Sequence, residues 1–362
     1  MSVRIVSQED RVVKTVIALC ARVAASAASC ALPAYAQAAE GGSAAHYQLA
    51  REVPLPGDEG WDYLSFDAAG GRLFVTHGTR VQVVDGASLA VVGEIPDTPG
   101  VHGVAIAQDL GRGYVSAGRA DSVVVFDLHT LKSVATIKVT GANPDAILYD
   151  PFSRRVFTFN GRGRNVTAID TATNEVVGTL PVDAKPEFAA TDGAGHVYVN
   201  LEDRNALAMI DPKALKISAT WPLSGCEEPS GLAIDRAHAR LFSVCSNKIM
   251  VIVDAATGQV VAREPIGARV DGVAFDATRG LAFATAGEGN LTIVHEDSPQ
   301  EFSVVQTLAT RAGARTVAVD EKMHRVFSVT ARFGPPAQPT KDQPYPRPRI
   351  EPGSFELLVM SP

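Results

Sequence analysis

The sequence has little cysteine, few aromatic residues and no strong excess of basic charge. Four cysteines in 362 residues are too few for a disulfide-dense scaffold. Aromatic residues make up 6% and charged residues 20%, and the formal net charge is -7. We expect no nucleic-acid partner, because binding a polyanion relies on clustered lysine and arginine. The C-x-x-C-H motif that attaches c-type haem is also missing.

Long hydrophobic runs are missing beyond the N-terminal region. A basic N-terminus precedes an apolar stretch, residues 15–31, and an A-x-A cleavage signal follows at 34–36. These features predict a signal peptide over residues 1–36 and a flexible N-terminus over 37–46, and therefore a periplasmic or secreted protein. No later stretch reaches the roughly 18 apolar residues that a spanning helix needs, so we expect no membrane span.

The chain contains instead a repeat of about 42 residues, present in seven copies. Each copy has short runs of Val, Ile, Phe and Tyr between clusters of Gly, Asp or Asn, as expected of β-strands. A marker position, usually aspartate, recurs at spacings of 40 to 44 residues: Asp67, Ala107, Asp150, Asp192, Asp235, Asp276 and Asp320. We interpret these aspartates as turn residues.

Four-stranded repeats of this length predict an all-β fold, a seven-bladed β-propeller. The seventh copy lacks a fourth strand, and the segment from Tyr47 to Pro54 has the fourth-strand pattern of the other copies. The N-terminal strand should therefore complete blade seven and close the ring, giving a single domain over residues 47–362. A proline-rich insertion, residues 333–353, interrupts blade seven and could serve as a lid, a docking strip or a rigid spacer.

Several strand motifs resemble those of a known family. The segments Leu-Phe-Val-Thr76, Gly-Tyr-Val-Ser116 and Val-Tyr-Val-Asn200, with the Asp-x-x-Thr turns that follow, are similar to the YVTN-repeat β-propellers, which include YncE-like exported bacterial proteins. The resemblance covers residues 47–362. It implies the fold and no single activity, because such propellers carry out very different tasks.

Seven equivalent positions, five residues before each marker, should lie at the mouth of the central channel. They are Asp62, His102, Asp145, Glu187, Ser230, Asp271 and Arg315. The four carboxylates are candidate ligands for a divalent cation, Ca²⁺, Mg²⁺, Mn²⁺ or Zn²⁺. His102 and Arg315 are candidate ligand-binding residues, and the planar fork of the arginine suits a carboxylate or phosphate. Alternatively, the charges pair among themselves in a hydrated channel, Arg315 with Asp62 or Asp271.

Further candidate ligand-binding residues belong to the same face. Trp61 could stack on a ligand, and neutral amides could complete a cation shell that carboxylates begin. The loops after the second strands supply Asn160, Asn200, Asn247, Glu288 and Arg332. In residue type, though not in order, this set is similar to gluconolactonase-like propellers. That similarity implies a divalent cation used for lactone hydrolysis.

Two cysteines remain after signal-peptide removal, Cys226 and Cys245. In an oxidising compartment an isolated pair favours a disulfide, which would contribute about 3 kcal/mol by closing this loop. A reactive thiol pair is the alternative.

We therefore expect an exported, monomeric propeller that binds a small ligand, a divalent cation or a periplasmic protein partner at the channel face. A binding or scaffold protein is favoured over an enzyme. Two alternatives remain open. One is a divalent-cation-dependent hydrolase of the lactonase type, and the other is a redox or scaffold partner subunit, like the propeller subunits of amine dehydrogenases.

Overall fold

The structure, a computed structural model, describes residues 46–336 and 348–362. The predicted signal peptide, all of the predicted flexible segment except His46, and the middle of the proline-rich insertion lie outside these residues. Nowhere in the described ranges is there a helix with the length and apolarity to cross a membrane.

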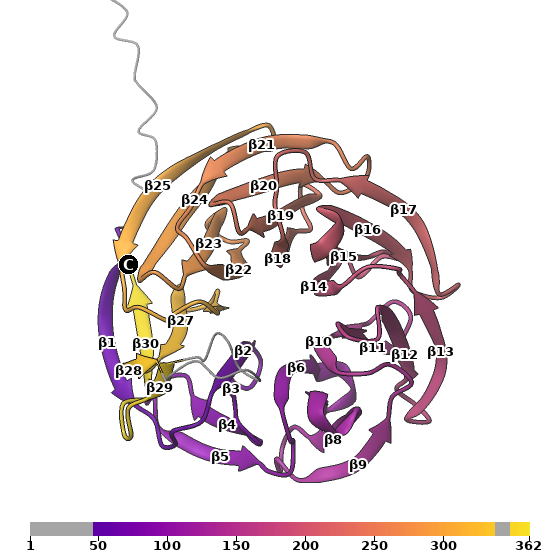
Figure 1. The fold of residues 1–362 in the computed structure, drawn as a ribbon, viewed down its shortest axis with the longest axis horizontal. Coiled ribbons are helices and arrows are strands. Elements are labelled where there is room, and N and C mark those ends of the chain that lie inside the picture. Colours follow the sequence, from indigo (N-terminus) through magenta and orange to yellow (C-terminus); the bar gives the residue numbers. More distant parts are fainter. Residues whose placement is uncertain (1–45, 337–347) are drawn as a thin grey trace, which may run out of the picture. The chain divides into compact units, whose positions relative to one another are not determined.

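Seven four-stranded antiparallel sheets form a ring, which confirms the all-β propeller (Figure 1). In six blades the strands run from innermost to outermost in chain order. Blade one consists of β2 (Trp61–Asp67), β3 (Arg72–His77), β4 (Arg80–Asp85) and β5 (Val91–Ile95). Blade two consists of β6 (Val101–Ala107), β7 (Arg112–Ala117), β8 (Ser122–Asp127) and β9 (Ser133–Lys138). Blade three consists of β10 (Pro144–Asp150), β11 (Arg155–Asn160), β12 (Asn165–Asp170) and β13 (Glu175–Pro181).

The next three blades repeat this arrangement. Blade four consists of β14 (Pro186–Thr191), β15 (Val197–Leu201), β16 (Ala206–Asp211) and β17 (Lys216–Pro222). Blade five consists of β18 (Pro229–Asp235), β19 (Arg240–Cys245), β20 (Ile249–Asp254) and β21 (Val260–Pro265). Blade six consists of β22 (Val270–Asp276), β23 (Leu281–Ala286), β24 (Asn290–Ser298) and β25 (Glu301–Ala309). Within residues 46–336 and 348–362, three short 3-10 helices lie in the loops: η1 (Gln108–Leu110), η2 (Gly118–Ala120) and η3 (Glu202–Arg204).

Blade seven joins the two ends of the chain, as predicted. Its strands, from the inside out, are β26 (Ala318–Asp320), β27 (Arg325–Thr330), β30 (Glu356–Ser361) and β1 (Gln48–Pro54). β1 pairs antiparallel with β30, so the N-terminal strand is the outer edge of this blade (Figure 1). The ring is thus closed by hydrogen bonds between the first and last strands.

The core lies between neighbouring blades. The middle strands, such as β3 and β19, are buried on both faces, whereas an outermost strand such as β13 alternates exposed and partly buried residues. Aromatic rings bridge adjacent blades, Phe74 to Phe126 at 5.6 Å and Phe242 to Phe275 at 4.9 Å between ring centroids. A single blade cannot bury both of its faces, so stacking in a ring completes the core.

The marker aspartates form turns, as interpreted from the sequence. Asp67 Oδ1 accepts a hydrogen bond from the backbone N–H of Gly70 at 3.0 Å, and Asp150 Oδ2 accepts one from that of Ser153 at 2.8 Å. Each carboxylate satisfies backbone donors between the first two strands of its blade. These turns lie at the end of each inner strand away from the channel mouth.

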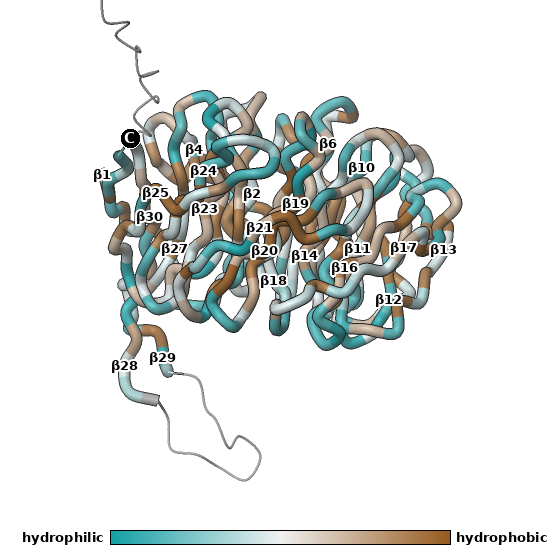
Figure 2. Tube along the Cα trace, turned by 90° about the horizontal axis from the view of Figure 1, so that it is seen from above, coloured by the Kyte–Doolittle hydropathy of each residue, from teal (hydrophilic) through white to brown (hydrophobic). Residues whose placement is uncertain are grey.

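The described parts of the proline-rich insertion form a two-stranded ribbon, β28 (Phe333–Pro336) and β29 (Pro348–Ile350). It projects from the body of the ring (Figure 2). Its base lies at the channel mouth, because the Phe333 ring is 5.9 Å from that of Trp61. Nearby, the backbone N–H of Gly353 donates to Asp58 Oδ1 at 2.6 Å.

Candidate functional site

The inner strands bring their first residues together around a cavity of about 1320 Å³. All inner strands run in the same direction around the ring, so equivalent side chains meet at one face. Six of the seven predicted ring residues line the cavity: Asp62, His102, Asp145, Glu187, Asp271 and Arg315. Ser230 is not part of its lining. We call this cavity the central cup.

His102 lies between two carboxylates of the cup. Its Nδ1 is 2.6 Å from Asp62 Oδ2 and 3.4 Å from Asp145 Oδ1. Burial lowers the pKa of His102, but the hydrogen bond to Asp62 and the charge of Asp145 outweigh it, so the pKa is raised. Burial, with the nearby charge of Asp62, raises the pKa of Asp145 to about 6. These three side chains lie close enough together to hold a metal ion.

Glu187 is the most deeply placed acid of the cup. Its Oε1 lies 2.5 Å from the ammonium group of Lys185, which also contacts Glu202. Burial, reinforced by the charge of Asp145, nevertheless raises the pKa of Glu187 to about 8.

Asp271 and Arg315 form the third charged group of the cup. Arg315 Nε donates to Asp271 Oδ2 at 2.8 Å and Nη2 donates to the backbone oxygen of Trp61 at 3.3 Å. Its guanidinium also lies 5.8 Å from the centre of the Trp61 ring. Burial raises the pKa of Asp271 to about 6 despite the arginine. Of the two pairings expected for Arg315, the structure contains the one with Asp271.

Tyr63 forms the floor of the cup. It starts from blade one, and its ring packs edge-on against Phe188 of blade four, with centroids 4.2 Å apart. Its hydroxyl lies 3.5 Å from Glu187 Oε2. Burial, followed by the surrounding carboxylates, raises the pKa of this phenol well above its usual value. This side chain thus reaches from blade one to blade four and lines the cup beside the acidic groups.

Basic residues that were not among the predicted ligand-binding residues also line the cup. They are Arg119, Arg162, Lys185 and Arg269. Two of them had a signal in the sequence, because Lys185 and Arg269 stand two residues before Glu187 and Asp271. Residues two apart lie on the same side of an extended chain.

Trp61 lines the cup, but most of its surface is covered by packing. Its ring centroid lies 5.4 Å from that of Phe355 and 5.9 Å from that of Phe333.

Two predicted amides lie outside the lining of the cup and are fully buried. Asn160 Nδ2 donates to Asn165 Oδ1 and to Thr167 Oγ1. Asn200 Nδ2 donates to the backbone oxygens of Ser230 and Gly231, which tie blade four to blade five.

The other three predicted loop residues also lie outside the cup lining, and they are exposed. Asn247 Nδ2 donates to the backbone oxygen of Gly225 at 2.8 Å. Glu288 accepts from Asn290 Nδ2 at 2.7 Å, and Arg332 Nε donates to Glu351 Oε2 at 3.1 Å. Of the predicted set, the structure thus gathers the inner-strand residues and Trp61 around one cavity.

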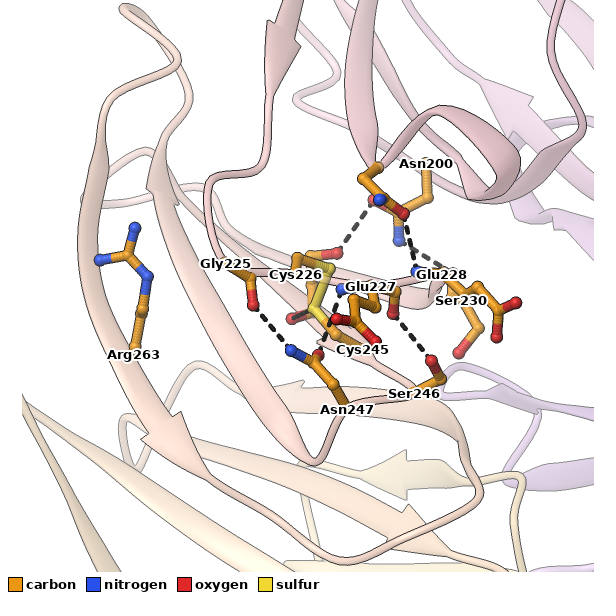
Figure 3. Close-up of a disulfide and its surroundings, with 12 residues drawn as sticks. Asn200, Gly225, Cys226, Glu227, Glu228, Ser230, Cys245, Ser246, Asn247 and Arg263 are labelled. Atoms are coloured by element: carbon orange, nitrogen blue, oxygen red, sulfur yellow. Dashed lines mark hydrogen bonds between the residues drawn. A yellow bond between two sulfur atoms is a disulfide. The ribbon is translucent and has the colours of Figure 1, made fainter.

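The predicted disulfide between Cys226 and Cys245 is present (Figure 3). The two Cα atoms are 5.4 Å apart, and the bond joins the loop before β18 to the end of β19. Both cysteines are buried, so the pair is a structural cross-link of blade five.

Comparison with known proteins identifies one curated relative. No family model matches the chain. The uncharacterized protein YncE of Salmonella typhimurium is 24% identical over 209 residues, which are 57% of this chain and 47% of the relative. This propeller resembles YncE. The matched part spans about half the length of that relative, and the likeness agrees with the strand motifs noted in the sequence.

Two solved structures share the fold. A chain of Kuenenia stuttgartiensis hydrazine synthase superposes with a TM-score of 0.65 and 19% identity, covering 75% of this chain and 93% of that one. A chain of the mitotic checkpoint complex superposes with a TM-score of 0.70 and 14% identity, covering 87% and 92%. At these identities the likeness concerns the fold alone.

Proposed function

We propose that the protein is an exported propeller that binds a divalent cation together with a small anionic ligand in the central cup. The observation that carries the proposal is the position of one imidazole nitrogen, His102 Nδ1, between the carboxylates of Asp62 and Asp145 at the wall of a large cavity. The disulfide and the resemblance to YncE support export.

The charges around His102 favour a bound cation. A proton on His102 Nδ1 can be donated fully to one acceptor, and the second carboxylate, on Asp145, is left at 3.4 Å in a partly desolvated site. A divalent cation would neutralise both carboxylates and accept the imidazole nitrogen as a third ligand. His102 must lose its proton to do so, so cation binding should strengthen as the pH rises.

The arginines of the cup favour an anionic ligand. Arg119, Arg162 and Arg269 line it, and within the described ranges none of them forms an ion pair with a carboxylate, whereas Arg315 is held by Asp271. Arginine presents a planar fork that suits carboxylate and phosphate groups. A cation at the wall of the cup and arginines lining the same cavity together fit a small ligand with acidic groups.

The test measures Mn²⁺ binding by the chain lacking residues 1–36, using dialysis and the fluorescence of Trp61. This residue is one of only two tryptophans, and it lies beside the cup. D62N and D145N should each weaken the Mn²⁺-dependent fluorescence change at least about tenfold, as expected when a charged ligand is lost. D97N is the matched control, because this exposed aspartate lies outside the cup lining.

Equal Mn²⁺ responses of D62N, D145N and the wild type would contradict the cation site. For the anion, citrate should bind more tightly in the presence of Mn²⁺, and R162A and R269A should reduce that binding. If the arginine variants bind citrate as the wild type does, the anion part of the proposal is wrong and the cation part stands alone.

Hydrolysis of a lactone by the same centre is a second candidate. The raised pKa values of Asp145 and Glu187 favour it, because a general base is most effective when its pKa lies near the ambient pH. Simple lactones incubated with the protein and Ca²⁺, Mn²⁺ or Zn²⁺ should then be opened, and E187Q should slow the reaction. Absence of turnover with all three metals would leave the binding function.

A further inference from the structure

A second group of carboxylates and imidazole lies away from the cup. It consists of Asp235 and His238 of blade five and Glu296 of blade six. Asp235 ends β18, and Ser230 stands near the start of that strand on the cup face. Five residues of extended chain separate these positions by about 17 Å. The group therefore lies toward the opposite face of the propeller and shares no residue with the cup.

Glu296 departs from the repeat. In blade six, Leu281 pairs with His295, just as Arg72 pairs with Asp85 in blade one, so Glu296 takes the place that follows the paired residue. In blades one, two, three and five the same place is held by Gly86, Leu128, Thr171 and Ala255. The side chains at this position in those four blades are uncharged, whereas blade six has a glutamate there.

This acid is buried without adequate partners. The Glu296 side chain is 3% exposed, Oε1 contacts only His238 Nδ1 of the group, and Oε2 has no hydrogen-bond partner among the described residues. Burial raises its pKa, and the charge of Asp235, also almost fully buried, raises it further. A buried carboxylate beside a second one is costly unless a positive charge compensates both.

His238 compensates the two acids only in part. Its Nδ1 lies 2.7 Å from Asp235 Oδ2 and 2.8 Å from Glu296 Oε1. One nitrogen carries at most one proton and cannot donate it fully to both acceptors. Arg240, which lies beside the group, is committed elsewhere, since Nη1 donates to Asp254 Oδ2 and Nε to the backbone oxygen of Pro299.

We propose that Asp235, His238 and Glu296 form a binding site for a divalent transition-metal ion of the Zn²⁺ class. Two carboxylate oxygens and one imidazole nitrogen, with water in the fourth position, match the ligand types and number of a tetrahedral zinc site. The three ligand atoms already lie within 4.8 Å of one another. Two charges from the metal would balance the two carboxylates and relieve the burial of Glu296.

The geometry requires only a small rearrangement. In a tetrahedral site with bonds of about 2.0–2.1 Å, ligand atoms are about 3.3 Å apart. The two contacts of His238 Nδ1 must therefore lengthen by about 0.5 Å on the same basis. The His238 side chain is half exposed, so it can move and admits the ion from solvent. The bound ion would clamp the turn between β18 and β19 to β24, and so fasten blade five to blade six.

The experiment measures zinc content and Co²⁺ absorption of the chain lacking residues 1–36, after treatment with a chelator and dialysis against micromolar metal. E296A and H238Q should each bind one equivalent of Zn²⁺ fewer than the wild type. In the Co²⁺-loaded protein they should lose the intense visible absorption of a tetrahedral site. E296A introduces the residue that blade five has at this place, Ala255, so metal-free E296A should melt at a higher temperature than the metal-free wild type.

Two controls separate this site from others. H324Q alters a similar pair on the same face, in which His324 Nδ1 lies 2.7 Å from Asp276 Oδ2, and it should keep the full zinc content. H102Q, in the cup, should keep the equivalent that E296A loses. Zinc content unchanged in both E296A and H238Q would overturn the site, and so would an equal loss in H324Q. If E296A does not fold, H238Q decides, because its side chain is half exposed.

Discussion

At the scale of single residues, the same local arrangement occurs twice, once on each side of the ring. His102 and His238 each place one ring nitrogen between two carboxylates from different strands. The sites differ in depth, since Glu296 is nearly fully buried while the carboxylates of Asp62 and Asp145 line an open cavity. A cavity can admit a ligand beside the ion, whereas a packed position cannot. We therefore propose ligand binding for the first and a structural role for the second.

Tyr63 provides the first prediction, because its side chain reaches from blade one to blade four. Its ring is buried against Phe188, and its hydroxyl lies 3.5 Å from Glu187 Oε2 and close to the carboxylate of Asp145. Y63A should lower the free energy of unfolding by about 3–5 kcal/mol, as is typical of removing a large buried aromatic. Y63F should cost only about 1 kcal/mol, because it keeps the ring and loses a weak hydrogen bond. Denaturant unfolding of both variants measures the difference.

The contrast between the two variants is informative. A small and equal loss for Y63A and Y63F would show that the ring packs poorly and that the channel is open below the acids. A large loss for both would show that the hydroxyl, rather than the ring, stabilises the centre of the propeller.

The ring of polar residues could be predicted from the sequence, whereas the outer candidates could not be placed. A position at a fixed distance from the repeat marker has the same place in every blade. The repeat alone therefore predicts which inner-strand residues lie together at the channel mouth. Asn160 and Asn200 stand at strand ends, where the direction of the side chain depends on partners from distant segments. Lys185 precedes Glu187 by two residues and lies on the same side of the extended chain, so the period of two in a strand would have placed it at the cup as well.

At the scale of elements, β1 closes the ring, and this leads to the second prediction. Tyr47, just before β1, is fully buried, packs on Phe283 at 5.1 Å and exchanges two hydrogen bonds with Gln306. Removing residues up to 54 should lower the free energy of unfolding by at least about 3–5 kcal/mol, the cost typical of one large aromatic. Hydrogen exchange of the β30 amides should accelerate, because their partner strand is lost.

A chain that begins at His46 is the control and should unfold as the longer chain does. If the shorter chain, starting after Pro54, protects the β30 amides equally, then the pairing of β1 with β30 does not hold the ring closed. In that case the contacts between the inner strands of blades one and seven would be sufficient.

The elements that follow the repeat could be predicted, and those that depart from it could not. The third-strand aspartate, present at Asp85 and again at Asp254, is replaced by His295 in blade six. There the turn gives way to a hairpin of two nine-residue strands, β24 and β25. The burial of Glu296 follows from this change. The change is specific to blade six, so the features common to the seven repeats do not predict it.

At the scale of the whole molecule, two sets of carboxylates respond to pH in opposite ways. Turn aspartates such as Asp127 and Asp254 have lowered pKa values. For Asp127 the main cause is the hydrogen bond from the backbone N–H of Thr130. Burial acts to raise the pKa of Asp254, but hydrogen bonds from Thr257 outweigh it. Their stabilisation is present above the unfolded pKa and is lost as the pH falls through the folded one. Burial raises the pKa values of Asp145, Glu187 and Asp271 in the cup, so ionising these three acids at higher pH destabilises the fold.

This opposition predicts that the metal-free protein is most stable near pH 4–5, the range just above the unfolded aspartate pKa. Asp145 and Asp271 lose stability between their unfolded pKa near 3.8 and their folded value of about 6, and Glu187 continues the loss to about pH 8. The raised pKa of His102 adds a loss above its unfolded value. For Asp271 alone the shift corresponds to about 3 kcal/mol.

Urea unfolding at pH 4.5, 6 and 8 in the presence of a chelator measures this slope, and E187Q should flatten it between pH 6 and 8 because an amide does not titrate. Mn²⁺ should raise the free energy of unfolding more at pH 8 than at pH 4.5, since the cation binds deprotonated ligands and only the folded chain gathers them. A stability that rises steadily from pH 4.5 to 8 without metal would mean that the cup acids ionise freely. Ionisation of these buried acids would then not destabilise the metal-free fold, and a cation would have no such destabilisation to offset.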